Sequence, residues 1–270
     1  MSDSFLEQNS NSASARNKSG GLPAAVILAG GLGTRLREAY ATGPKCMAPV
    51  GGRPFLSYLL TWLRSQGVEE VILCVGYKRT HIQKYVGKGR KWGLRVKYSI
   101  EEELLGTGGA VKKAECLVSG TRLFVVNGDT FLGVNLREMF KFHLSRGALA
   151  TLAVVNVADD GRYGSLRLDD EGKITAFLEK GEGDLGHKSD ETTKSINGGV
   201  YIFEKKLLNH IRAPGPVSLE KNVFPQIVAS KNKKVFGLLM DAYFVDIGVP
   251  KDLWRAQREL PERFRVNDPH

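Results

Sequence analysis

The sequence contains no long apolar run and little cysteine. No stretch comes near the roughly 18 consecutive apolar residues that span a bilayer, so a helical membrane protein is excluded. The cysteines, Cys46, Cys74 and Cys116, form neither a C-x-x-C pair nor an even framework. A disulfide scaffold and a structural zinc site are therefore not expected, and the count is typical of a reducing compartment such as the cytoplasm.

Acidic residues are fewer than basic ones. The chain of 270 residues has 29 Asp and Glu against 39 Lys and Arg, so its net charge is +10. Such an excess occurs in nucleic-acid-binding proteins, but here the basic residues are scattered and no aromatic-interleaved RNA-binding motif is present. We interpret the excess as a solvated surface or a cleft that attracts polyphosphates. A nucleic-acid-binding module is an alternative that rests on charge alone and predicts salt-sensitive binding to random duplex.

Short apolar segments alternate with amphipathic ones in the first half of the chain. Nearly continuous hydrophobic runs, typical of central parallel strands, occur at 24–28, 71–75 and 123–127. Helical spacing, with Pro54 expected at a first helical position and Asn135 as a cap, predicts helices over 54–67, 78–86, 110–117 and 135–147. This alternation predicts an α/β fold with a Rossmann-like, doubly wound mixed sheet.

The second half is richer in strands. Polarity alternates over 165–180 around a turn, which predicts a hairpin. Further strands are expected at 196–204, 235–240 and 243–248, followed by a helix from 250 to about 259. We predict a single domain over 23–262, divided into a first half (23–147) and a strand-rich second half (148–262), with a disordered leader at 1–22 and a tail at 263–270.

A glycine-rich loop follows the first predicted strand. It holds Gly30, Gly31 and Gly33. Glycines let the backbone turn sharply and bring its N–H groups close to an anion. The loop matches neither standard nucleotide fingerprint, because Leu36 stands where the dinucleotide pattern needs glycine and no G-x-x-x-x-G-K-[ST] occurs. Arg35 in the loop and Lys45 after it add cations, so the segment indicates a triphosphate cradle, whereas the loop alone is equally consistent with a turn.

Two aspartates follow predicted strands. Asp129, beside Gly128 in NGDT (127–130), lies where open α/β sheets bind ligands, and it is well placed to hold Mg²⁺ on phosphates. Asp246 in FVDIG offers a second carboxylate for the same metal. Acidic groups with a polyphosphate suit magnesium, whereas zinc favours His and Cys. The alternative is that each Asp caps a turn or a helix.

Taken in order, these and further motifs resemble those of the sugar-1-phosphate nucleotidylyltransferases. The motifs are GGLGTRL (30–36), Pro44–Lys45, LGTGGA (105–110), NGD (127–129), Tyr163–Gly164, Glu179–Lys180, Asn197–Gly198–Gly199 and VDIG (245–248). Within the family, PKCMAPVGGRPFLSYLL and EEELLGTGGA are most similar to the heptose 1-phosphate guanylyltransferases, whose product feeds bacterial surface-polysaccharide synthesis. Cys46 and Leu104 stand where the family commonly has Pro, which concerns loop rigidity more than chemistry.

The resemblance implies a fold of the nucleotide-diphospho-sugar transferase type, with nucleotide bound by the first half and sugar phosphate by the second. It implies that the sugar phosphate attacks the α-phosphorus of a nucleoside triphosphate and expels pyrophosphate. The catalytic residues that it implies are Arg35 and Lys45, and the Mg²⁺ ligands are Asp129 and Asp246. The nucleotide-binding residues are Leu28, Gly30, Gly31, Gly33, Thr34, Glu101, Gly106, Thr107 and Gly128. The sugar-phosphate-binding residues are Tyr163, Gly164, Glu179, Lys180, Asn197 and Gly198.

Glu101 is the residue expected to read the base. Relatives that use uracil or thymine carry a Gln five residues before the glycine matching Gly106, and an amide supplies one acceptor and one donor. An ionised carboxylate only accepts, and guanine offers adjacent N1–H and 2-amino donors, so Glu101 favours GTP. A mismatched buried pair costs about 1–3 kcal/mol. Because Glu101 begins a run of three glutamates, a neighbouring Glu, or a solvated acidic edge, is an alternative.

We therefore predict a cytoplasmic enzyme that joins GMP from GTP to D-glycero-D-manno-heptose 1-phosphate, with Mg²⁺ as cofactor. We expect these substrates as its partners, and neither nucleic acid nor a membrane. Whether it forms a homodimer is left open. One alternative is the same chemistry with UTP or dTTP on a hexose 1-phosphate. Another is a nucleotide-binding regulator, which binds GTP but releases no pyrophosphate.

Overall fold

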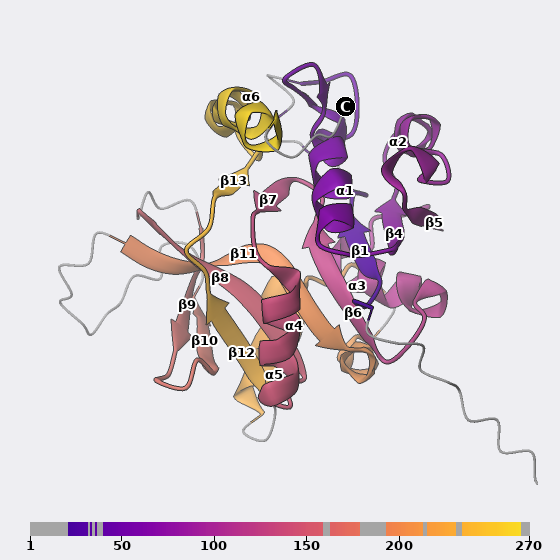
Figure 1. Cartoon of the computed structure of the whole chain (residues 1–270). Helices are drawn as coiled ribbons and strands as arrows, with labels where there is room; N and C mark the ends of the chain where they lie inside the picture. Colours follow the sequence, from indigo (N-terminus) through magenta and orange to yellow (C-terminus); the bar gives the residue numbers. More distant parts are fainter. Residues whose placement is uncertain are drawn as a thin grey trace, which may run out of the picture.

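A mixed sheet of seven strands forms the centre of the domain (Figure 1). This computed structural model describes residues 21–31, 33, 36, 40–158, 163–178, 193–212, 215–230 and 234–265. The sheet order is β12-β8-β11-β6-β1-β4-β5, and β11 runs antiparallel to both of its neighbours while the other pairs are parallel. The strands are β1 (Ala25–Leu28), β4 (Glu70–Val75), β5 (Arg95–Ile100), β6 (Arg122–Asn127), β8 (Ala150–Ala158), β11 (Thr193–Glu204) and β12 (Val235–Leu239).

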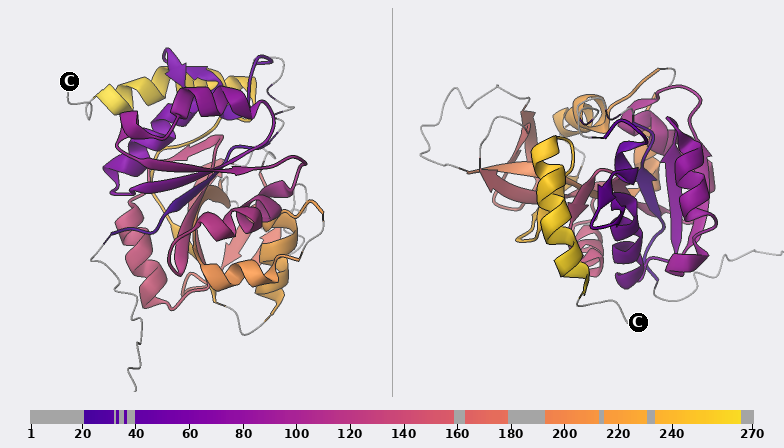
Figure 2. Two further views of the ribbon diagram at one scale, coloured as in Figure 1. Left: turned by 90° about the vertical axis from the view of Figure 1, so that its right-hand side faces the viewer. Right: turned by 90° about the horizontal axis from the view of Figure 1, so that it is seen from above.

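Helices cover both faces of this sheet, which confirms the doubly wound α/β fold (Figure 2). The face that carries Ala25 and Ile27 packs against α1 (Phe55–Ser65), α2 (Arg79–Val86), α4 (Leu136–Ser145) and α6 (Pro250–Arg265). The face that carries Val26 packs against α3 (Gly106–Ala114), α5 (Phe224–Ala229) and the short turns η5 (Lys205–His210) and η6 (Leu219–Val223). Strands buried on both faces must be nearly continuously apolar, as the sequence of β1, β4 and β6 is.

Helix boundaries follow the expected signals with three corrections. Asn135 caps α4 as predicted, because its Oδ1 accepts from the backbone N–H groups of Arg137 and Glu138 at 3.0 and 3.2 Å. Pro54 has an extended ψ of 142° and is the cap of α1 rather than its first residue. Helix α3 begins at Gly106, before the predicted start at 110. Helix α6 continues to Arg265, beyond the predicted end at about 259 and into the predicted tail.

Short strands complete the fold and tie the end of the chain to its first half. The predicted hairpin is present as β9 (Ser165–Leu168) and β10 (Ile174–Leu178). Strands β2 (Pro49–Val50) and β3 (Arg53–Pro54) pair with each other, and β13 (Phe244–Asp246) pairs antiparallel with β7 (Thr130–Leu132). Helix α6 then packs beside α1, where the rings of Tyr58 and Phe264 meet at 5.1 Å (Figures 1 and 2). None of the described helices is long and apolar enough to cross a membrane.

Candidate active site

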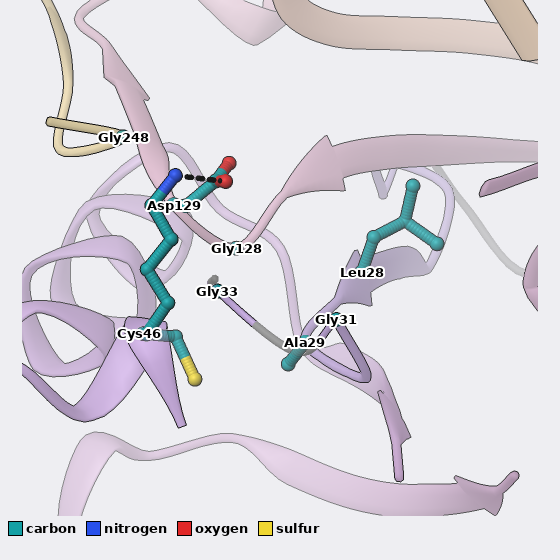
Figure 3. A pocket seen from close by; sticks show the side chains of 9 residues that line it. Leu28, Ala29, Gly31, Gly33, Cys46, Gly128, Asp129 and Gly248 are labelled. Carbon is teal, nitrogen blue, oxygen red and sulfur yellow. Dashed lines mark hydrogen bonds and ion pairs between the residues drawn. The ribbon is translucent and has the colours of Figure 1, made fainter. Parts of the chain in front are cut away.

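A pocket of about 200 Å³ opens where β1 and β6 end side by side. The chain passes from β1 to β4 on one side and later to β6 on the other, and ligands of open α/β sheets bind at such a switch point. Figure 3 shows Asp129 and Cys46 on one side of the pocket and Leu28 on the other. The lining residues are Leu28, Ala29, Gly31, Gly33, Lys45, Cys46, Gly128, Asp129 and Gly248.

Two glycines allow the strand ends to approach this closely. A Cβ on Gly128 would lie 2.6 Å from the carbonyl oxygen of Leu28, and a Cβ on Gly30 would lie 2.5 Å from Oε1 of Glu101. Gly128 has no room for a side chain, because the backbone oxygen that it would meet cannot move aside, and a side chain at Gly30 would displace the Glu101 carboxylate. The glycines therefore place the loop after β1 directly against β6 and Glu101.

Lys45 joins two carboxylates from distant parts of the chain. Its Nζ lies 2.6 Å from Oδ2 of Asp129 and 3.5 Å from Oδ1 of Asp246, and its side chain is 12% exposed. Asp129 follows β6, and the β7–β13 pairing places Asp246 opposite Thr130. Gly248 N–H donates to Oδ1 of Asp246 at 2.7 Å, which holds the second carboxylate in place. The structure thus brings the two predicted carboxylates together on Lys45, and their role as ligands of one metal stays a prediction.

The charges in this cluster shift the pKa values of their neighbours. Burial alone would raise the pKa of Asp129, but the Lys45 ammonium, together with hydrogen bonds from Lys45 and Thr130, lowers it on balance. Cys46, which is 3% exposed, has its pKa raised to about 12 by burial and by the Asp129 charge. Asp129 is therefore an anion and Cys46 a neutral thiol at neutral pH.

The donor set fits magnesium better than zinc. Among the described residues no group of three or more His, Cys, Asp and Glu side chains gathers that could hold a metal by itself. Magnesium commonly takes one or two carboxylates and completes its shell with water and substrate phosphates. Asp129 and Asp246 supply that number of carboxylates beside the pocket.

Burial distinguishes Glu101 from the other glutamates of its run. Glu101 is 7% exposed, and its Oε1 has no hydrogen-bond partner in the part of the chain that the structure describes. Burial raises its pKa, against the opposing effects of the Leu105 N–H and Lys113. Glu102 instead forms an exposed ion pair with Arg79 at 2.8 Å, and Glu103 is exposed. Glu101 is thus the one of the three with a buried acceptor left for a ligand.

The residues at the start of α3 are already engaged in contacts and hydrogen bonds with other segments of the protein. Gly106 has a φ of +69°, and a Cβ there would lie 2.5 Å from the Val217 carbonyl oxygen. That carbonyl accepts from the Gly108 N–H at 2.7 Å, so it takes a donor that an anion would otherwise use. The Thr107 hydroxyl donates to Glu220 at 2.8 Å and accepts from the Leu219 N–H. As nucleotide-binding residues, Gly106 and Thr107 stay predictions.

The predicted sugar-phosphate residues are only partly described. The Tyr163 ring packs on Phe244 at 6.0 Å, with half-exposed Gly164 beside it. Asn197 donates through Nδ2 to Tyr201 at 2.7 Å, and a Cβ on Gly198 would lie 2.5 Å from the Leu132 side chain. The predicted residues outside the described ranges are Thr34, Arg35, Glu179 and Lys180.

Three pocket residues were absent from the predicted site. Gly248 belongs to the VDIG motif (245–248) and Ala29 directly precedes GGLGTRL (30–36), so a signal existed at both positions. Cys46 was noticed only as a departure from the usual Pro. The available signal was its place next to Lys45. Both residues belong to the short helical turn η2 (Lys45–Met47), and both line the pocket.

Comparisons with known proteins show the family of the chain. The chain is 42% identical over 236 residues, 87% of this chain and 97% of the relative, to D-glycero-alpha-D-manno-heptose 1-phosphate guanylyltransferase of Aneurinibacillus thermoaerophilus. It is 37% identical to mannose-1-phosphate guanylyltransferase of Mycobacterium tuberculosis, over 87% of this chain and 64% of that relative. The crystal structure of HddC from Yersinia pseudotuberculosis complexed with GMP-PN has a TM-score of 0.75 and 33% identity, covering 88% of this chain and 100% of that one. Residues 24–263 match the nucleotidyl transferase family, to which the chain belongs.

Proposed function

We propose that this protein joins GMP from GTP to D-glycero-D-manno-heptose 1-phosphate and releases pyrophosphate. The observation that carries the chemistry is the convergence of Asp129 and Asp246 on Lys45 at the switch point of the sheet. Relatives named as guanylyltransferases support GTP as the donor.

The reaction needs positioning and charge neutralisation more than proton transfer. A sugar monophosphate has a second pKa of roughly 6, so it is largely a dianion at neutral pH and is already a nucleophile. One of its oxygens forms a bond to the α-phosphorus of GTP, and the bond to the β-phosphate oxygen breaks with its electron pair leaving on pyrophosphate. Lys45, held beside the pocket, faces the phosphates and offsets their charge. Arg35 is proposed to act on the same phosphates.

We propose that Asp129 and Asp246 hold Mg²⁺ when nucleotide is bound. The two carboxylates and the phosphate oxygens form the hard oxygen set that this ion prefers. Bound there, the ion supplies additional neutralisation of phosphate charge. Lys45 then keeps both carboxylates oriented before the ion arrives, because it contacts both of them.

Glu101 is proposed to select guanine. Its buried Oε1 lies against Gly30 of the loop and has no partner among the described residues. Guanine N1–H and its 2-amino group would satisfy this acceptor, whereas uracil would bring a carbonyl oxygen against it. A buried acceptor left unmet costs about 1–3 kcal/mol, which is the origin of the discrimination.

The sugar is proposed from resemblance. Identity of 42% to a heptose 1-phosphate enzyme exceeds the 37% to a mannose-1-phosphate enzyme. Lys180 is proposed to hold the sugar phosphate, with Glu179, Asn197 and Gly164 on the sugar hydroxyls. We place the reaction in the cytoplasm, because Cys46, Cys74 and Cys116 are all free. The GDP-sugar product would serve surface-polysaccharide synthesis.

The test is pyrophosphate release with Mg²⁺ across four nucleoside triphosphates and a panel of sugar 1-phosphates that includes manno-heptose and mannose. Release with GTP and the heptose phosphate alone is the expected result. Release with UTP or dTTP and a hexose phosphate would retain the mechanism and discard the assignment of Glu101. GTP binding without release from any sugar would favour a regulator.

A further inference from the structure

A chain of polar side chains lies between β11 and η6, on the face of the sheet that α3 and α5 cover. Its centre is Tyr201, which is fully buried. The phenol donates to Oε1 of Glu220 at 3.1 Å and accepts from Nδ2 of Asn197 at 2.7 Å. Burial and the Glu220 charge raise the pKa of Tyr201 well above its ordinary value. The phenol therefore keeps its proton and remains the donor to Glu220.

The Glu220 carboxylate receives hydroxyl groups from three segments. Besides Tyr201, Thr107 donates to its Oε2 at 2.8 Å and Ser218 at 2.9 Å. An ionised carboxylate only accepts, so the direction of all three hydrogen bonds is determined. A charged acceptor also makes each of them stronger than a bond between neutral groups.

The fixed direction of the Tyr201–Glu220 hydrogen bond also determines how Asn197 is hydrogen-bonded. Because the Tyr201 proton points at Glu220, the phenol oxygen can only accept from the Asn197 amide. The Asn197 carbonyl then faces the other way and accepts from the Gly199 N–H at 3.0 Å. Glu220 thereby selects one orientation of the Asn197 amide, although it does not touch that residue.

The other end of the chain reaches the start of α3. The Thr107 hydroxyl accepts from the Leu219 N–H at 2.8 Å while it donates to Glu220. The Leu105 carbonyl accepts from the Val217 N–H at 2.8 Å, which anchors the same turn. This turn begins four residues after Glu101, and the Leu105 N–H acts against burial to lower the pKa of the Glu101 carboxyl group.

We propose that Glu220 is a positioning residue shared by the two substrate sites. Through Thr107 it holds the turn that follows Glu101, the residue proposed to read guanine, and through Tyr201 it orients the amide of Asn197, a residue proposed to contact the sugar. The proposal rests on the function proposed above and adds a residue to which no role in the reaction was assigned. A rigid link of this kind keeps the residues that contact the two substrates in their binding orientation before either substrate arrives.

Steady-state kinetics with GTP and heptose 1-phosphate test the link. Glu220→Gln is expected to raise the KM for both substrates about fivefold, because it removes the charge that strengthens all three hydrogen bonds and replaces one acceptor oxygen with a donor. Tyr201→Phe loses one charge-assisted hydrogen bond and is expected to raise only the KM for the sugar phosphate. We expect kcat to stay within about twofold in both variants. Ser218→Ala is the matched control. It also removes one hydrogen bond to Glu220, together with a helix cap, so it lowers the melting temperature without changing either KM.

Unchanged KM values in Glu220→Gln, with a stability loss like that of Ser218→Ala, would reduce the residue to a structural role and overturn the proposal. If Glu220→Gln does not fold, an unaltered sugar KM in Tyr201→Phe overturns it. If the wild-type protein shows no turnover, the proposed function is refuted instead. The link from Glu220 to Asn197 is then tested by NMR, where the side-chain amide signal of Asn197 is expected to shift in Tyr201→Phe and not in Ser218→Ala. An unshifted signal in Tyr201→Phe overturns the link.

Discussion

The two ends of the parallel strands use charge in different ways. At the carboxyl ends, Lys45 is shared by Asp129 and Asp246 and is 12% exposed. At the amino ends, the ion pairs are separate: Arg95–Glu69 at 3.2 Å, Lys97–Glu70 at 3.1 Å and Arg122–Glu204 at 2.6 Å. Each basic side chain in these pairs is more exposed than Lys45. In the function proposed above, the shared cluster is held in advance for a ligand, whereas separate surface pairs contribute little to stability.

The hollows at the two ends of the parallel strands rank by volume in the opposite order to their charge organisation. The groove at the amino ends measures about 600 Å³, against about 200 Å³ for the pocket at the carboxyl ends. The smaller pocket is the one with glycines that allow backbone contact and with convergent charges. In this fold, chemistry is marked by convergent polar groups and close backbone, and volume alone is a poor guide.

Asp129→Asn should have the largest effect. Loss of one carboxylate from the cluster is expected to lower kcat by about a thousandfold, because charge stabilisation is usually the largest catalytic contribution. The melting temperature should change little. Glu69→Gln, the matched change at the amino ends, should leave kcat unaltered. Pyrophosphate release measures both, and near-normal activity in Asp129→Asn would remove this residue from the site.

Lowering the pH should destabilise the protein through His143, near the amino ends of the parallel strands. His143, 1% exposed and bonded to Thr151 at 3.0 Å, has its pKa lowered from 6.5 to about 4 by burial, against the Glu204 charge and with the help of Arg122. The unfolded chain binds this proton first, so stability is lost as pH falls from 6.5 towards 4. The loss is up to about 3 kcal/mol. Urea unfolding of wild type and His143→Asn at neutral pH and at about pH 5 measures it, and equal acid loss in both would assign the effect elsewhere.

Glu101→Gln should change base preference by up to about a hundredfold in the ratio of kcat/KM for GTP to that for UTP. A Gln amide both donates and accepts, so it suits uracil better than a carboxylate does. Glu102→Gln is the control, since Glu102 is exposed and paired with Arg79. The same shift in the control, or none in Glu101→Gln, would place base recognition on another residue.

The smallest effect is expected for the Arg95–Glu69 pair, whose side chains are 67% and 64% exposed. A double-mutant cycle with Arg95→Met and Glu69→Gln should give a coupling free energy below about 1 kcal/mol in urea unfolding. The coupling should shrink further in high salt. A value of several kcal/mol would show that the amino ends are as tightly organised as the carboxyl ends.

Strong local patterns predicted much of the fold. The apolar runs at 24–28, 71–75 and 123–127 became β1, β4 and β6, because strands buried on both faces leave a clear signal. The first turn of α3 was missed, since Gly106–Gly109 has poor helix propensity and the turn depends on Val217, more than a hundred residues away. Strands β5 and β8 were not predicted. In β5, an edge strand, polar and apolar residues mix and only Ser99 is fully buried.

The candidate site was predictable where it lies at strand ends. Asp129 and Asp246 were expected to meet, and they share Lys45. Glu101 could not be separated from its neighbours, because burial is a tertiary property. Glu220 carries no local signal at all, since its partners Tyr201 and Thr107 come from other segments.

The order in which the cluster is assembled has a consequence for synthesis on the ribosome. Lys45 and Asp246 are 201 positions apart, and Asp246 is held by the β7–β13 pair while α6 covers Tyr58. A domain generally folds as a unit during synthesis, so the first half cannot bury its aromatic surface until the last strand and helix have emerged. In a nascent chain, the cluster proposed to face the phosphates is therefore incomplete. A fragment truncated by premature termination would be inactive, would aggregate readily and would need chaperones.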